Sequence, residues 1–161
     1  EFNSGIKGYM KLGEENITKS LLLWLESQSW NILAYDFPQS GTGVIIHPDD
    51  DIRVTKNKGG IIPDIIAIKD GSVVFFENKD RFDEKDFVKV NLLRVDKKYE
   101  MSIAKFLGSH FYSNIYFGVG LANIPRIRKR IDERRDMVDF AVLVSSSRDI
   151  CIYYQSKLIF Q

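Results

Sequence analysis

The sequence has few residues of the types that crosslink a fold or bind soft metals. Cys151 is the only cysteine, which excludes an internal disulfide framework and is typical of a reducing compartment such as the cytoplasm. Two histidines, His47 and His110, leave no Cys/His cluster for zinc. No apolar run reaches the roughly 18 residues that a membrane-spanning helix needs, and the first residues lack the regions of a signal peptide. We therefore expect a cytoplasmic protein with no membrane segment.

The chain also lacks an excess of charge of either sign. With 23 basic and 22 acidic residues, the formal net charge is +1. The bulk composition therefore does not indicate nucleic-acid binding, and any basic surface has to come from local segregation of charge. A length of 161 residues with 44% hydrophobic residues suffices for one domain with a sizeable core. Residues 1–9 look like a cloning remnant ahead of Met10, so we expect a single domain over residues 10–161.

Hydrophobic spacing predicts alternating helices and strands. A first helix is expected within residues 13–29, a second over 83–106 ended by Gly108, and a short basic one over 124–137 with Pro125 near its start. Strands are expected at residues 30–37, 64–68, 73–79, 114–122, 140–145 and 150–155. Residues 44–60 read as an irregular insertion with room for one strand. The alternation of strand and helix in the second half favours right-handed crossovers and parallel pairing.

The clearest local structure is a β-hairpin whose two turn residues are Asp70 and Gly71, a preferred pair for such turns. The expected cross-strand pairs are Lys69 with Ser72, Ile68 with Val73, Ile66 with Phe75, and Asp64 with Glu77. Because alternate side chains of a strand share a face, Lys79 points to the same side as both acids. The register thus predicts two carboxylates as direct cross-strand neighbours, with a lysine beside them.

Carboxylates placed opposite each other on a hairpin have Cβ atoms about 5 Å apart and repel, so a cation has to offset them. Mg²⁺ prefers carboxylate oxygens, accepts as few as one or two of them, and keeps waters and substrate phosphates as its other ligands. A bound metal also lowers the pKa of its water and neutralises charge on a phosphate oxygen. The pattern therefore predicts a phosphodiesterase site. The alternative is a surface ion-pair cluster at a fraying strand end, which the apolar character of both strand faces disfavours.

Pro63-Asp64, followed after the hairpin by Glu77-Asn78-Lys79, resembles the PD-(D/E)xK motif of the restriction-endonuclease-like nuclease superfamily. The resemblance implies an α/β fold with a central mixed sheet flanked by helices, in the order helix, three strands, helix, strand. That order agrees with the elements expected from spacing. It also implies that Asp64 and Glu77 bind Mg²⁺, for which Mn²⁺ can substitute, with the Asn78 carbonyl as a further ligand and Lys79 as the catalytic lysine.

Many members of the superfamily also take an acidic residue from the first helix. Glu14 precedes the inward-facing positions Ile17 and Leu21, so we prefer it to Glu15, which is angled away. An acidic residue in a first helical turn also interacts favourably with the helix dipole, which needs no catalysis. The role of Glu14 is therefore open between these two.

Two other stretches are candidate DNA-binding elements. The basic residues of the 124–137 segment could contact phosphates and make binding salt-dependent, or could form a solvated helix face paired with neighbouring acids. Those we consider are Arg126, Arg128, Lys129 and Arg130. Ser40 and Gly41 could approach the DNA backbone, since glycine permits close contact, or belong to a plain loop. The acids at 49–51 beside His47 favour a solvated turn over a second metal site.

The leading hypothesis is a Mg²⁺-dependent DNA endonuclease of a prokaryote or phage, most simply a small restriction enzyme. A chain this short would act as a homodimer in which each protomer cuts one strand of a symmetric site. A second hypothesis is a structure-selective nuclease resembling archaeal Holliday junction resolvases, whose motif order is echoed at Ser40-Gly41, Pro63-Asp64 and Glu77 to Lys79. A third is a DNA-binding or cleavage subunit that needs a partner protein.

Overall fold

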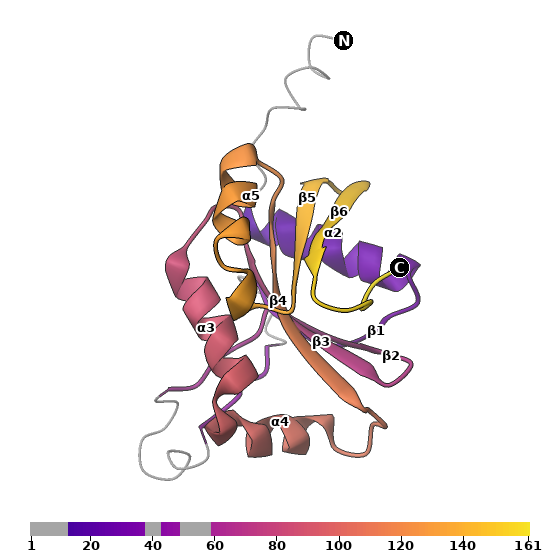
Figure 1. The fold of residues 1–161 in the computed structure, drawn as a ribbon. Coiled ribbons are helices and arrows are strands. Elements are labelled where there is room, and N and C mark those ends of the chain that lie inside the picture. Colours follow the sequence, from indigo (N-terminus) through magenta and orange to yellow (C-terminus); the bar gives the residue numbers. More distant parts are fainter. Residues whose placement is uncertain (1–12, 38–42, 49–58) are drawn as a thin grey trace.

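A computed structural model describes residues 13–37, 43–48 and 59–161, which form a six-stranded mixed β-sheet flanked by helices (Figure 1). The strands are β1 (Asn31–Tyr35), β2 (Ile65–Lys69), β3 (Ser72–Lys79), β4 (Asn114–Ala122), β5 (Phe140–Ser146) and β6 (Asp149–Gln155). Their order across the sheet follows the chain. β3, β4 and β5 run parallel to one another, and the remaining neighbours are antiparallel. The α/β class and the mixed sheet expected from the sequence are confirmed.

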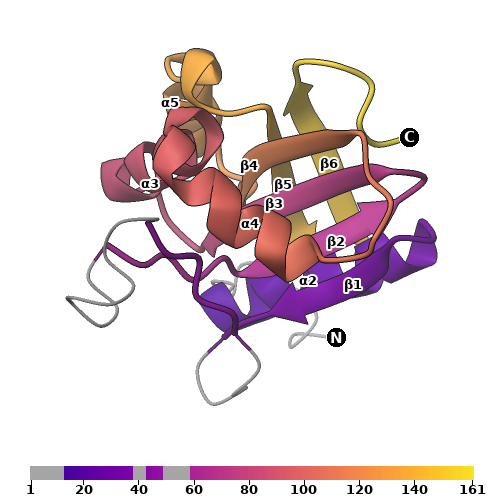
Figure 2. The same cartoon turned by 90° about the horizontal axis from the view of Figure 1, so that it is seen from below.

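Helices cover both faces of this sheet. α2 (Glu14–Ser27) lies on one face, and α3 (Glu84–Val95) and α4 (Glu100–Leu107) lie on the other (Figures 1 and 2). α5 (Pro125–Asp132) connects β4 to β5 together with the short 3₁₀ helix η2 (Arg135–Met137). The central strands β3 and β4 are therefore buried on both sides, which explains their continuous apolar sequences.

α2 forms because its apolar residues fall on one stripe. Ile17, Leu21 and Leu25 recur at four-residue steps and are fully buried against the sheet. Burial of each such side chain contributes about 1.5–3 kcal/mol, so the stripe anchors the helix. The same layer is completed by Phe160, whose ring packs 5.1 Å from that of Phe140.

The hairpin predicted around Asp70 and Gly71 is confirmed. The two residues have φ angles of 49° and 81°, which is the left-handed conformation that a type I′ turn requires at both positions. The pairing that follows runs from Lys69↔Ser72 to Ile65↔Phe76, in the expected register. The side chains of β3 consequently alternate between the α3 side, where Glu77 points, and the α2 side.

The helix expected over residues 83–106 is interrupted. α3 ends at Val95, and Asp96 takes an extended conformation with φ −87° and ψ 112°. Its side chain accepts a hydrogen bond from the backbone N–H of Lys98 and thereby caps the 3₁₀ helix η1 (Lys97–Tyr99), after which α4 begins. A short polar side chain that bonds to nearby backbone competes with helix continuation, which hydrophobic spacing alone does not register. Gly108 ends α4 with φ 55°, as expected.

Only a small part of the predicted insertion lies within the described residues. There, Ile46 forms an isolated antiparallel bridge with Ile61. The expectations for residues 1–9, for Ser40 and Gly41, and for the acids at 49–51 fall outside the described ranges. Within those ranges, none of the helices is both long and apolar enough to cross a membrane.

Candidate functional site

Acidic side chains from three elements meet at the end of the sheet away from the hairpin turn. Asp64 directly precedes β2, Glu77 lies near the end of β3, and Glu14 is the first residue of α2. Asp64 is only 7% exposed. The negative charge of Glu14 raises the pKa of both other carboxyls, although burial is the larger cause in each. The fold therefore brings together the three acids that the sequence singled out.

Asp64 is held by its backbone and its carboxylate, and it is not the direct ladder partner of Glu77 that we expected. The β2–β3 ladder ends one pair earlier, and the Asp64 N–H donates to the Phe76 carbonyl at 2.9 Å. Its carbonyl accepts from the Asp36 N–H at 2.9 Å, and its Oδ2 accepts from the Asn78 N–H at 2.7 Å. These three hydrogen bonds draw Asp64 out of the regular register while fixing its carboxylate against β3.

The ionisation of the two central acids is strongly perturbed. Burial, and next the charge of Glu77, raise the pKa of Asp64 to about 8 despite the hydrogen bond from Asn78. Burial raises the pKa of Glu77 to about 7 even though the Lys89 ammonium lowers it. Buried carboxylates that repel each other are destabilising unless a cation compensates them, and perturbed ionisation of this kind is typical of functional sites.

Two lysines flank Glu77, and sequence reasoning identified one of them. Lys89, on α3, donates from Nζ to Glu77 Oε2 at 2.8 Å. Lys79 lies two residues beyond Glu77 on the same strand, but its Nζ is 3.7 Å from the carboxylates of both Asp83 and Asp86. The ammonium expected to serve the attacking water is thus held toward the start of α3.

Lys89 and Asp86 contact the candidate site residues Glu77 and Lys79, and the motif did not reveal them. The spacing contains this signal, because residues 86, 87, 90 and 93 form the buried face of α3 and residue 89 adjoins it. Asp86 is 4% exposed, and its Oδ2 is buried without a hydrogen-bond partner within the described part of the chain. Charged residues on or beside the inward face of a helix that follows an acidic strand end therefore indicate contacts with that strand end.

Asn78 has a structural role that is distinct from the predicted carbonyl ligation. Its side chain points to the α2 face, where Nδ2 donates to the Thr18 hydroxyl at 3.0 Å. A Cβ atom at Gly120 on β4 would lie 2.4 Å from Asn78 Oδ1 and 2.3 Å from Leu21 Cδ1. The absence of a side chain at Gly120 therefore lets α2 approach β3 and β4 closely, which places Glu14 at the end of the sheet.

The donor set suits a hard divalent cation. Asp64 and Glu77 supply carboxylate oxygens, and buried Asp86 Oδ2 has the Lys79 ammonium 3.7 Å away but no hydrogen-bond partner among the described residues. No three carboxylate, imidazole or thiol groups of the described chain form a complete metal-binding cluster. Mg²⁺ does not need one, since one or two carboxylates with waters and substrate phosphates satisfy it. The residues therefore fit Mg²⁺ held partly by its substrate.

The four basic residues proposed for DNA binding separate on α5. Arg126 and Arg130, one turn apart, line a hollow that also contains Arg81. Arg128 instead donates to Asn123 Oδ1 at 2.6 Å. Lys129 is exposed and does not line this hollow. The basic stretch is therefore not one uniform surface.

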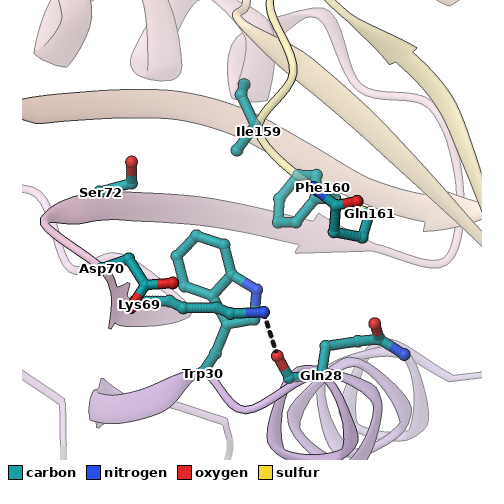
Figure 3. A pocket seen from close by; sticks show the side chains of 8 residues that line it. All are labelled: Gln28, Trp30, Lys69, Asp70, Ser72, Ile159, Phe160 and Gln161. Atoms are coloured by element: carbon teal, nitrogen blue, oxygen red, sulfur yellow. Dashed lines mark hydrogen bonds between the residues drawn. The ribbon is translucent and has the colours of Figure 1, made fainter.

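A second hollow lies at the opposite end of the hairpin, beside the turn. It has a volume of about 140 Å³, and Lys69, Trp30 and Phe160 are among the residues that line it (Figure 3). The Lys69 ammonium is engaged with the Gln28 carbonyl at 2.7 Å. It contains none of the acids of the candidate site.

Comparison with known proteins adds no identification. No protein-family description, curated protein or solved structure matches this chain.

Proposed function

We propose that this chain is a Mg²⁺-dependent nuclease with a restriction-endonuclease-like fold that hydrolyses phosphodiester bonds in DNA. The order α2, β1, β2, β3, α3, β4, with β3 parallel to β4, supports this fold. The observation that carries the function is the pair of buried acids Asp64 and Glu77 at the end of the sheet, whose pKa values are raised by burial and, to a smaller extent, by the charge of nearby Glu14. Such a pair is destabilising by itself, and a cation that binds phosphate accounts for it.

Each residue has a distinct part in this proposal. Asp64 and Glu77 hold the ion, and when bound it supplies an activated water and neutralises charge on the phosphate. Lys89 orients Glu77 through its hydrogen bond to Oε2. Lys79, positioned by Asp83 and Asp86, contributes positive charge near the reacting phosphate. The assembly we expect is a homodimer, since one such site cuts one strand.

The direct test is to incubate the purified protein with Mg²⁺ and, separately, linear duplex, supercoiled plasmid and a four-way junction. Discrete duplex fragments indicate a restriction enzyme, and symmetric nicking of the junction alone indicates a structure-selective nuclease. Cutting that appears only after a second protein is added indicates a cleavage subunit. Absence of cutting with Mg²⁺ and with Mn²⁺ on every substrate, with or without cell extract, contradicts the proposal.

Variants test the assignment of the site. We expect Asp64→Ala and Lys79→Ala each to lower the cutting rate by at least about a hundredfold while DNA binding is retained. Glu14→Ala has a matched control in Glu15→Ala, because the Glu15 side chain is 43% exposed and pairs with Lys19 at 2.7 Å. If Glu14→Ala cuts DNA at the same rate as Glu15→Ala, Glu14 is not part of the site.

A further inference from the structure

A basic hollow borders the candidate site on the side of α5. We call it the α5 groove, and its lining includes Asp80, Arg81, Phe82, Arg126, Ile127 and Arg130. Its volume is about 400 Å³. Asp80 and Arg81 directly follow Lys79 in the chain, so the groove begins where the proposed catalytic strand ends. A polymer lying across the candidate site would therefore pass into it.

The charge of the α5 groove is positive and largely uncompensated. Three arginines face one aspartate, and Asp80 is already paired with Arg81 at 3.3 Å. Among the residues the structure describes, neither Arg126 nor Arg130 forms an ion pair with a carboxylate. Their neighbour Arg134, in contrast, binds Glu84 at 2.6 Å. The arginines of the groove therefore have charge available for an anion.

An aromatic ring holds Arg130 in place. The Arg130 guanidinium lies 5.1 Å from the centre of the Phe82 ring, and that of Arg134 lies 4.7 Å from it. Phe82 in turn packs 5.6 Å from Phe87, which is fully buried on α3. A guanidinium positioned by a ring keeps its hydrogen-bond donors, whereas one positioned by a carboxylate has used some of them. Arg130 is thus ordered before any ligand arrives.

We infer that the α5 groove binds the sugar-phosphate backbone of the DNA strand beside the bond that is cut. This inference rests on the proposed nuclease function and adds the path of the substrate to it. Guanidinium groups match phosphate oxygens in geometry and charge. The groove directly follows Lys79 in the chain, and a ligand that spans both the groove and a phosphodiesterase site is a nucleic-acid strand rather than an acidic peptide.

The test measures equilibrium binding of a fluorescent duplex in EDTA, where no cutting occurs, over a series of salt concentrations. We expect Arg126→Ala and Arg130→Ala each to weaken binding about tenfold at low salt, since each loses a charge-assisted hydrogen bond. Each should also reduce the slope of log affinity against log salt by about 0.9, the value for one phosphate contact in duplex DNA. Both side chains are exposed, so folding should be retained, and circular dichroism checks this.

Two control variants test whether the loss of any positive charge weakens DNA binding, or only the loss of an arginine in the α5 groove. Lys105→Ala removes one exposed positive charge from α4, at the other end of α3, and should leave affinity and slope unchanged (Figure 1). Lys129→Ala removes one from α5 itself but outside the groove. If Lys129→Ala or Lys105→Ala weakens binding as much as Arg130→Ala, the groove is not the binding path and the inference is overturned.

The same measurements distinguish DNA binding by the α5 groove from the proposed nuclease function. A wild-type protein that cuts DNA, with Arg126→Ala and Arg130→Ala binding like wild type, would overturn the groove and leave the nuclease proposal standing. A wild-type protein that neither binds nor cuts any DNA would overturn both. An acidic peptide that displaces the duplex at equal charge concentration would show an unspecific anion site and would also overturn the inference.

Discussion

At the scale of single residues, Asp64 and Glu77 have strongly raised pKa values, and burial is the largest cause in both. In the unfolded chain both carboxyls have ordinary pKa values near 4, whereas folding raises the pKa of Asp64 to about 8 and that of Glu77 to about 7. Between these limits the folded protein binds more protons than the unfolded one. The free energy of unfolding without metal must then fall as pH rises through this window.

We therefore predict a stability that decreases from pH 5 to pH 8 in EDTA, by as much as about 1.4 kcal/mol per pH unit for each proton concerned. Urea unfolding at several pH values measures it. Asp64→Asn keeps an oxygen for the Asn78 N–H and removes the charge, so this variant should be more stable than wild type at pH 8 and show a flatter profile. If the free energy of unfolding of the wild type rises over this pH range, the pKa values of the two acids are not raised by folding.

Lys89 provides a second prediction at this scale. Replacing it by methionine leaves Glu77, 11% exposed in its side chain, without its nearest cation. Because the Lys89 side chain is 36% exposed, solvent screens part of the loss, and we expect a destabilisation of about 1–2 kcal/mol at pH 8 in EDTA. Lys85→Met, an exposed position on the same helix, is the control. The additional substitution Glu77→Gln should remove most of the effect, and equal losses in both backgrounds would refute a specific pair.

At the scale of elements, the hairpin turn sets the position of the site residues from a distance. Gly71 has φ 81°, and a Cβ atom there would lie 3.2 Å from the Phe111 ring. Gly71→Ala should therefore lower the free energy of unfolding by about 1–2 kcal/mol. Asp70→Asn, which keeps a residue suited to the left-handed conformation, should change it little. Thermal unfolding compares the two, and equal stabilities would argue against a strained turn.

Element-scale packing also explains why α2 reaches the site. Its buried stripe packs across the sheet, and the hydrogen bond from Asn78 Nδ2 to the Thr18 hydroxyl links it to β3. Glu14 is carried to the end of the sheet by this packing rather than by any local feature of its own. The first turn of α2 is thus a consequence of contacts made further along the helix.

At the scale of the whole molecule, the proposed cation site predicts that cation binding is coupled to folding. An ion that binds the folded chain stabilises it by about 2.7 kcal/mol when its concentration is a hundred times its dissociation constant. We predict that millimolar Mg²⁺ or Mn²⁺ raises the melting temperature of the wild type, and more at pH 8 than at pH 5.5, because the ligands must be deprotonated.

The control for this prediction is the double variant Asp64→Asn/Glu77→Gln, which retains the shape of the site without its charge. Its melting temperature should respond to Mg²⁺ no more than to an equal ionic strength of Na⁺. A wild type that behaves like this variant would exclude a metal site at these residues, whatever activity the protein shows.

Local chemistry made much of this structure predictable. The Asp-Gly pair fixed the hairpin register, and the four-residue spacing from Ile17 to Leu25 fixed the inward face of α2. The departure of Asp64 from the ladder depends on hydrogen bonds with Asp36 and Asn78, which sequence spacing does not encode. The pairing of Lys89 with Glu77 likewise depends on how α3 packs across the sheet.

Which of the basic residues on α5 line the groove could not be predicted from the sequence for a similar reason. Arg126 and Arg128 have the same charge and lie two residues apart, yet only the first lines the α5 groove. Residues two apart on a helix point in nearly opposite directions, so the spacing separates the two arginines, but which of them faces Phe82 and the β3–α3 connection is set by how α5 packs. This is a property of tertiary packing, and composition does not contain it.

The two-residue turn also limits which insertions and deletions the protein can accept between β2 and β3. Adding or removing one amino acid between β2 and β3 would shift the strand by half its side-chain repeat. The Glu77 side chain would then point to the α2 side, toward Thr18, and the Asn78 side chain would point to the α3 side in its place. Length changes between these strands therefore have to come in steps that preserve side-chain parity, whatever residues they introduce.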